Sequence, residues 1–319
     1  MRFAAALGLS LVASQAASDP VLSFPLDCVL GETCHIQQYV DRDPGPGARD
    51  FTCAGLSYDG HKGTDFSLPS LEAMEQGVAV LAAAPGIVTG LRDQISDQFY
   101  TQERAAGVDG IECGNGVLIR HADGWETQYC HLKRGSVRVQ PNQRVERGEV
   151  LGEVGLSGKT QFPHLHLSVR HNGQVVDPFA ISSTSTCGQS DAHLWADLPP
   201  YEPGAMISAG FSPRVPSYAE IHTGETAYGT LPADGEALVL WGFAFGGRKG
   251  DVIRIEIEGP NGPFARHDST LDKDQARFFR AYGKRLKAKR WAPGTYSGRV
   301  TLLRDGRAIS TTSTLARIY

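Results

Sequence analysis

Residues 163–169 alternate histidine with leucine in a run that otherwise favours a β-strand. Side chains two positions apart in a strand point to the same face, with Cα atoms roughly 6.5–7 Å apart. His164 and His166 therefore share one face, and Leu165 and Leu167 share the other, where we expect the core. The histidine face is either wet or occupied by a metal. For this run alone, one hydrogen-bonded core histidine and one exposed histidine is the commoner explanation.

The chain of 319 residues is long for one domain and sufficient for two. Hydrophobic residues at 41%, charged residues at 21% and a net charge of -4 are typical of a globular protein, and they argue against disorder and against nucleic acid as a partner. Its 37 glycines and 18 prolines, with few long amphipathic patterns, predict a turn-rich, all-β chain.

The N-terminus has the pattern of a secretory signal peptide. A positive charge at Arg2 precedes the apolar residues 3–12 and the small residues 13–17, and we expect cleavage after Ala16, which makes residues 1–16 the signal peptide. No other stretch approaches the roughly 18–20 apolar residues that span a bilayer. We therefore expect an exported monomer, periplasmic or extracellular, with no transmembrane segment.

Six cysteines form an even set in a chain bound for an oxidising compartment, which favours disulfides over metal ligation. The sequence alone does not select among the many pairings. The pairs that we favour are Cys28 with Cys34, which closes a short loop, then Cys113 with Cys130, and finally Cys53 with Cys187.

Residues 116–132 give a strong hairpin signal, two β-rich runs around Asp123-Gly124. On the second arm, Thr127, Tyr129 and His131 are expected to share one face. His131 would then end a strand beside polar neighbours, where a single histidine is more often exposed or hydrogen-bonded than catalytic.

The pair Cys113 and Cys130 needs an irregularity in this hairpin. A simple two-residue turn would put Val117 opposite Cys130, so the pair requires a bulge near residues 114–116.

His61 and Asp65 lie in the glycine-rich run 58–69. On a straight strand they would share a face but lie roughly 13 Å apart, too far for one ion, and the glycines and proline make a helix improbable. If the two side chains meet, the chain must bend at Gly63, where we expect a positive φ that only glycine adopts cheaply.

The surrounding segments complete a compact antiparallel β-sheet domain over residues 56–181. Residues 17–55 are polar and proline-marked, which predicts an irregular leader. Residues 78–90 predict two short buried strands around a Pro-Gly turn, and residues 92–112 predict a long surface loop. An Asn-Gly pair predicts a hairpin within residues 169–178.

Residues 58–178 resemble the lysostaphin-type, LytM-like zinc metallopeptidases, which cut peptidoglycan peptides. The resemblance rests on four ordered motifs: His61-x-x-x-Asp65, the hairpin ending in Tyr129-Cys130-His131-Leu132, Gly152-x-Val154-Gly155 with Ser157-Gly158, and His164-x-His166. Two departures, the insertion at residues 92–112 and the extra residues 71–76, leave these motifs intact but leave substrate preference open.

The resemblance implies one Zn²⁺ per chain, held by His61, Asp65 and His166, with His131 and His164 as catalytic residues. Nitrogen and oxygen ligands suit zinc, and catalytic zinc sites supply three protein ligands and keep one position open. His131 and His164 could act as base towards water and as donor to the oxyanion or leaving amine. The sequence does not assign these roles between them.

The C-terminal third predicts a linker at residues 182–204 and a seven-stranded, immunoglobulin-like β-sandwich domain at residues 205–319. A basic run could bind an anionic envelope polymer, although a solvated loop is the commoner explanation. Its residues are Lys284, Arg285, Lys287, Lys289 and Arg290.

The function that we expect is a zinc-dependent metalloendopeptidase that hydrolyses cross-bridge or stem peptides of its partner, peptidoglycan. One alternative is a catalytically silent relative that activates another wall hydrolase, but silent relatives usually lack ligands, and all five site residues are present. A second alternative is a secreted protease that acts on ordinary proteins.

Overall fold

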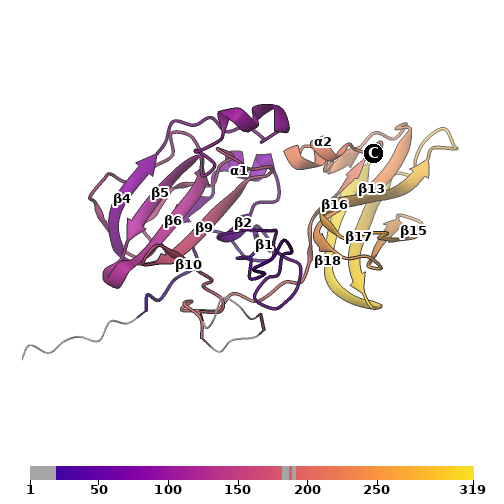
Figure 1. The fold of residues 1–319 in the computed structure, drawn as a ribbon. Coiled ribbons are helices and arrows are strands. Elements are labelled where there is room, and N and C mark those ends of the chain that lie inside the picture. The colour runs from indigo at the N-terminus through magenta and orange to yellow at the C-terminus, as the bar shows by residue number, and fades with distance from the viewer. Residues whose placement is uncertain (1–18, 182–186, 189–191) are drawn as a thin grey trace, which may run out of the picture.

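The structure, a computed structural model, describes residues 19–181, 187–188 and 192–319. An N-terminal part and a C-terminal part, which begins at Ala205, lie side by side (Figure 1). Both are built mainly of strands, which confirms the prediction of a mostly β chain. The expected signal peptide lies outside the described residues. None of the described helices is long and apolar enough to cross a membrane.

One sheet of eight strands organises the N-terminal part, and its pairings are antiparallel. In spatial order the strands are β1 (His35–Gln38), β2 (Thr64–Ser67), β9 (His164–His171), β6 (Trp125–Leu132), β5 (Asn115–Arg120), β4 (Gly86–Arg92) and β7 (Arg144–Val145), with β10 (Gln174–Val176) paired to β9. A separate pair of strands is β3 (Ala79–Leu81) and β8 (Val150–Glu153). The short helices are α1 (Leu71–Gln76) and the 3-10 turns η1 (Gln102–Gly107) and η2 (Ala122–Gly124).

The alternation along β9 decides which face of this sheet is buried. Leu165 and Leu167 are fully buried and belong to the same core as Val80 of β3. His164 and His166 lie on the opposite face. Asp65 of β2 is the direct partner of His166 and therefore shares that face. Strand pairing alone thus brings a carboxylate beside the two imidazoles.

Part of the expected leader is a strand. β1 lies within residues 17–55 and pairs with β2 at the edge of the large sheet. The prediction of an irregular segment is wrong at these four residues, because a run this short shows no readable period. All four side chains of β1 are buried, so the segment is an integral part of the sheet.

Where the structure describes it, the expected linker also packs against the N-terminal part. Leu194 and Trp195 are buried, and the N–H of Leu194 donates to the carbonyl of Pro178 at 2.9 Å. Trp195 forms a backbone bridge with Leu22. Residues 192–204 therefore cover the N-terminal part and are not a free spacer.

The C-terminal part has two sheets. The three-stranded sheet orders β11 (Ala205–Ser212), β13 (Ala237–Gly247) and β16 (Gln275–Arg285), and the five-stranded sheet orders β12 (Thr230–Leu231), β18 (Arg307–Ile318), β17 (Gly294–Arg304), β14 (Val252–Gly259) and β15 (Gly262–Thr270). It therefore has eight strands where we expected seven, because the two-residue β12 is too short to predict. The helix α2 (Tyr218–Thr223) follows β11.

The core of the N-terminal part continues into the C-terminal part, which also has a core of its own. Alternate residues of β13 face opposite ways: Leu240 packs inside the C-terminal part, whereas Phe243 and Phe245 join the core of the N-terminal part. The ring of Phe245 lies 5.5 Å from that of His35 on β1. The helices α1 and α2 also meet at this junction (Figure 1). The C-terminal part is therefore packed firmly beside the large sheet.

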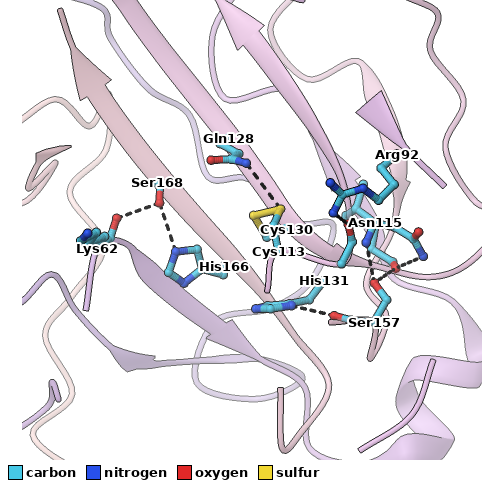
Figure 2. Close-up of a disulfide and its surroundings, with 12 residues drawn as sticks. Lys62, Arg92, Cys113, Asn115, Gln128, Cys130, His131, Ser157, His166 and Ser168 are labelled. Atoms are coloured by element: carbon cyan, nitrogen blue, oxygen red, sulfur yellow. Dashed lines mark hydrogen bonds between the residues drawn. A yellow bond between two sulfur atoms is a disulfide. The ribbon is translucent and has the colours of Figure 1, made fainter. Parts of the chain in front are cut away.

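Three disulfides are present. They join Cys28 to Cys34, Cys53 to Cys187 and Cys113 to Cys130, which are the pairs favoured from the sequence. The third pair crosses the hairpin of β5 and β6 beside the histidine face of the sheet (Figure 2).

Candidate functional site

Three polar side chains converge on the histidine face of the large sheet. Nε2 of His61 lies 3.1 Å from Nδ1 of His166 and 3.2 Å from Oδ1 of Asp65. Nδ1 of His166 lies 2.8 Å from the same oxygen. Within the described part of the chain, this is the one group of histidine, cysteine and acidic side chains arranged to hold a metal ion.

Hydrogen bonds behind the two imidazoles turn their free nitrogens toward this point. Nδ1 of His61 donates to the carbonyl of Tyr39 at 2.7 Å. Nε2 of His166 donates to Oγ of Ser168 at 3.1 Å, and Ser168 donates to the carbonyl of Lys62 at 2.7 Å (Figure 2). The other ring nitrogen of each imidazole therefore faces Asp65, as it faces the metal in metal-binding histidines.

The cluster attracts positive charge. Burial alone lowers the pKa of His61, but the charge and hydrogen bond of Asp65 outweigh it and raise that pKa above its usual value. Burial alone would raise the pKa of Asp65, but His61 and His164 hold it well below its usual value. Ligand atoms on a tetrahedral zinc, each at about 2.0–2.1 Å, lie about 3.3 Å apart. The observed spacings are close to this, so the three residues fit a metal ion.

His164 and His131 stand beside this cluster with their rings 4.6 Å apart. Nε2 of His164 is 3.5 Å from Oδ1 of Asp65, and the ring of His131 is 6.0 Å from that of His166. Nδ1 of His164 donates to the carbonyl of Phe162 at 2.9 Å, and Nδ1 of His131 donates to the carbonyl of Ser157 at 2.8 Å. The structure thus brings together all five residues that the sequence singled out.

His131 reaches this face through a β-bulge. Cys130 pairs with Gly116 and Leu132 pairs with Asn115, so His131 is an extra residue, and its φ is 64°. The prediction that His131 shares a face with Thr127 and Tyr129 is wrong, since those two side chains are buried in the core. The bulge that the disulfide requires does exist, but its extra residue lies on the second arm of the hairpin.

Both of these histidines are held neutral. Burial is the main cause that lowers the pKa of His131 well below its usual value, with the charges of His164 and His166 adding to it. Burial also lowers the pKa of His164, although Asp65 opposes that shift. Because each Nδ1 carries the proton, each Nε2 is available to accept one at neutral pH.

Gly63 allows the His61 segment to approach β9. The chain does bend there, but its φ is not positive, so the reason that we expected is wrong. A Cβ at this position would lie 2.5 Å from Nε2 of His166 and 2.7 Å from the carbonyl of Leu167. Glycine is required for space.

The sequence did not indicate the groups that orient the five site residues. Of these groups Ser168 has the clearest signal, because it lies two positions after His166 on the same strand face. The carbonyl of Tyr39 comes from the supposed leader and has no side-chain signal. Phe162 stacks on His164 with ring centroids 4.5 Å apart, and the guanidinium of Arg277, from β16, lies 4.4 Å from the Phe162 ring. This last contact crosses between the two parts of the molecule.

Comparisons with known proteins find relatives of this region. Residues 59–178 match the model of peptidase family M23. The DD-carboxypeptidase/endopeptidase Mpg of Neisseria meningitidis is 38% identical over 137 residues, which are 43% of this chain and 26% of Mpg. The peptidoglycan DD-endopeptidase ShyC of Vibrio cholerae is 32% identical over 37% of this chain and 22% of its own length.

A third relative has a different description. The cell division protein DipM of Caulobacter vibrioides is 36% identical over 32% of this chain and 14% of its own length. The chain thus aligns with about a quarter or less of each of these curated relatives. What the comparisons show is that residues 59–178, less than half of the chain, are similar to peptidase family M23.

Proposed function

We propose that this protein is a zinc-dependent endopeptidase that hydrolyses peptide bonds of peptidoglycan. One observation carries the proposal: the ligand atoms of His61, Asp65 and His166 converge within 3.2 Å of one another, beside the neutral imidazoles of His131 and His164. Relatives named as peptidoglycan DD-endopeptidases support the choice of substrate.

We propose one Zn²⁺ per chain, held by His61, Asp65 and His166. When bound, zinc would activate a water molecule and polarise the scissile carbonyl. Nε2 of His131 or His164 accepts a proton from the water, and the imidazolium that forms donates this proton from Nε2 to the oxyanion or to the leaving amine. The carbonyls of Ser157 and Phe162 keep each proton on Nδ1 and so direct Nε2 to the reaction.

The test is release of peptides from purified sacculi by the zinc-loaded protein. We expect release by the wild type and none after chelation or in His61→Ala. A zinc-loaded wild type that releases nothing from sacculi would contradict the proposal. Cleavage of casein without cleavage of sacculi would favour a protease of ordinary proteins, and stimulation of a second hydrolase without cleavage would favour a silent activator.

We propose that the protein works outside the cytoplasm, in the periplasm or beyond it, as a monomer. Three disulfides support an oxidising compartment. We further propose the division into a signal peptide (1–16), a leader (17–55), a peptidase domain (56–181), a connecting segment (182–204) and an immunoglobulin-like sandwich (205–319). Two sheets packed around a core of their own support the last assignment.

We also infer that the C-terminal part binds an anionic polymer of the cell envelope. A cleft of about 590 Å³ lies between the β14–β15 turn and the loop after β16. Its lining includes Lys284, Arg285, Lys287 and Arg290, and no acidic residue. Phe264, Trp291 and Tyr296 supply apolar walls that suit sugar rings, and the cations suit carboxylates or phosphates.

Salt-sensitive binding to sacculi tests this inference. Replacing Lys284, Lys287 and Arg290 by Gln should weaken co-sedimentation several-fold, and high salt should do the same to the wild type. The matched control replaces three exposed arginines of the same part, Arg299, Arg307 and Arg317, by Gln. Equal loss in both triple variants would show a non-specific charge effect and overturn the inference.

A further inference from the structure

Besides the hydrogen bond from Nδ1 of His131 to the carbonyl of Ser157, a second contact holds the bulge at His131. The N–H of His131 donates to the carbonyl of Cys113 at 2.8 Å. Cys113 belongs to the segment that enters β5, and its sulfur is bonded to that of Cys130, the residue immediately before His131. A covalent bond and a hydrogen bond therefore tie one short segment to two consecutive residues of β6.

The entering segment is shaped to lie over the strand. The chain turns at Gly114, whose φ is 64°, and a Cβ there would lie 2.4 Å from the carbonyl carbon of Ser157. A Cβ at Gly116 would lie 2.9 Å from Sγ of Cys113 and 2.5 Å from the carbonyl of Tyr129. The glycines thus leave room for the disulfide directly against the hairpin.

The disulfide also lies on the histidine face. Cys130 is the cross-strand partner of His166, and Nε2 of Gln128 approaches Sγ of Cys113 at 3.5 Å. Figure 2 shows the two sulfurs beside the rings of His131 and His166. The hydrogen bonds described above join the three proposed zinc ligands to Tyr39, to Ser168 and to one another. The entering segment therefore takes no part in those hydrogen bonds.

We propose that the Cys113–Cys130 disulfide is a positioning element for His131, an inference that rests on the proposed peptidase activity. A non-glycine residue disfavours positive φ, so the strand would relax toward regular alternation if nothing held the bulge. Regular alternation would turn the imidazole toward the core face. The disulfide keeps the Cys113 carbonyl under the His131 N–H and so holds the ring on the metal side.

The test compares two disulfide-free variants, Cys113→Ser/Cys130→Ser and, as matched control, Cys28→Ser/Cys34→Ser. Each loses one disulfide. For cleavage of a soluble cross-linked muropeptide, we expect kcat to fall at least tenfold in the first variant, with KM and bound zinc unchanged. The control should stay within about twofold of the wild type. If the first variant also keeps the wild-type kcat, the inference is overturned.

A double-mutant cycle separates positioning from general destabilisation. In the His131→Ala background, removing Cys113–Cys130 should cost no further activity, because the group that it positions is absent. An equal loss with and without His131 would contradict the inference. An inactive zinc-loaded wild type would instead contradict the proposed function.

Reduction of the folded wild type serves if the serine variant does not fold. Cys113 is partly exposed, so the bond is accessible to a phosphine reductant. In the Cys28→Ser/Cys34→Ser background, loss of kcat should follow reduction of Cys113–Cys130, located by alkylation and mass spectrometry, and reoxidation should restore it at constant zinc content. Full activity after complete reduction of this bond would overturn the inference.

Discussion

The strand β9 and the end of β6 bring histidines to the same site by different means. β9 is regular, and its alternation places His164 and His166 on one face and leucines on the other. β6 would put His131 in the core by the same rule, and only the extra residue at the bulge turns its imidazole outward. A regular strand places alternate side chains on one face through its two-residue period, whereas a bulged residue needs other residues to hold its conformation.

This difference predicts where substitutions act. Substitutions on β9 should act directly, by removing a side chain that is proposed to bind the metal or by removing or moving the His164 imidazole. Changes near the end of β6 should act on the backbone conformation of His131 and leave the metal in place.

The largest effect is expected for His166→Ala. It removes one of three proposed ligands and leaves Asp65 buried without its 2.8 Å partner, so bound zinc and activity should both fall to background. Metal analysis of the dialysed protein, alongside peptide release from sacculi, measures both. Retention of one zinc per chain would show that the ligand set is different.

His131→Ala and His164→Ala should lower kcat while keeping zinc. Loss of a general acid or base typically costs about 10²–10⁴-fold. Both variants should reduce kcat by that order, because each removes an Nε2 that faces the cluster. Zinc content serves as the control. Loss of zinc in either variant would mean that the replaced histidine is a ligand, which would contradict its proposed role as a catalytic residue.

Glycine substitutions should differ in sign between the two strands. At residue 131 the positive φ favours glycine, so His131→Gly should be more stable than His131→Ala by about 1–2 kcal/mol. At residue 164, within the regular strand, His164→Gly should be less stable than His164→Ala by about 0.5–1 kcal/mol. Urea unfolding of the metal-free proteins measures both differences. The same sign at both positions would contradict the bulge.

The smallest effect is expected from acidification. Burial lowers the pKa of both His131 and His164, so both stay neutral and able to accept a proton below the pH at which an ordinary histidine becomes charged. With an ordinary pKa of about 6.5, kcat would fall about fourfold between high pH and pH 6. We expect a smaller fall in the zinc-loaded wild type, measured as kcat against pH. A fall centred at pH 6.5 would place an exposed histidine in the mechanism.

The sequence predicted the features that depend on strand period and order along the chain. The spacing of His164-x-His166 indicated that both side chains share one strand face. The ordered motifs of the family resemblance placed His61, Asp65 and His131 in the same site. The face of His131 could not be predicted, because alternation carries no sign of an extra residue. The reason for a glycine at position 63 could not be predicted either, because the ring that fills the space beside it belongs to His166, more than a hundred residues away in the chain.

The contacts between the two parts also could not be predicted from the sequence. Nothing around Arg277 indicates that its guanidinium lies between the rings of Phe162 and Phe243. Likewise, the short run at residues 35–38 has no period that would identify an edge strand.

The apolar core that continues from the large sheet into β13 has a consequence for how the molecule unfolds. Cutting the chain before Ala205 would uncover Phe243's partners and strip Arg277 from Phe162, the ring that supports His164. The N-terminal part is therefore not an independent module: both parts should unfold in a single cooperative step, and the truncated protein should be both less stable and less active than the full chain.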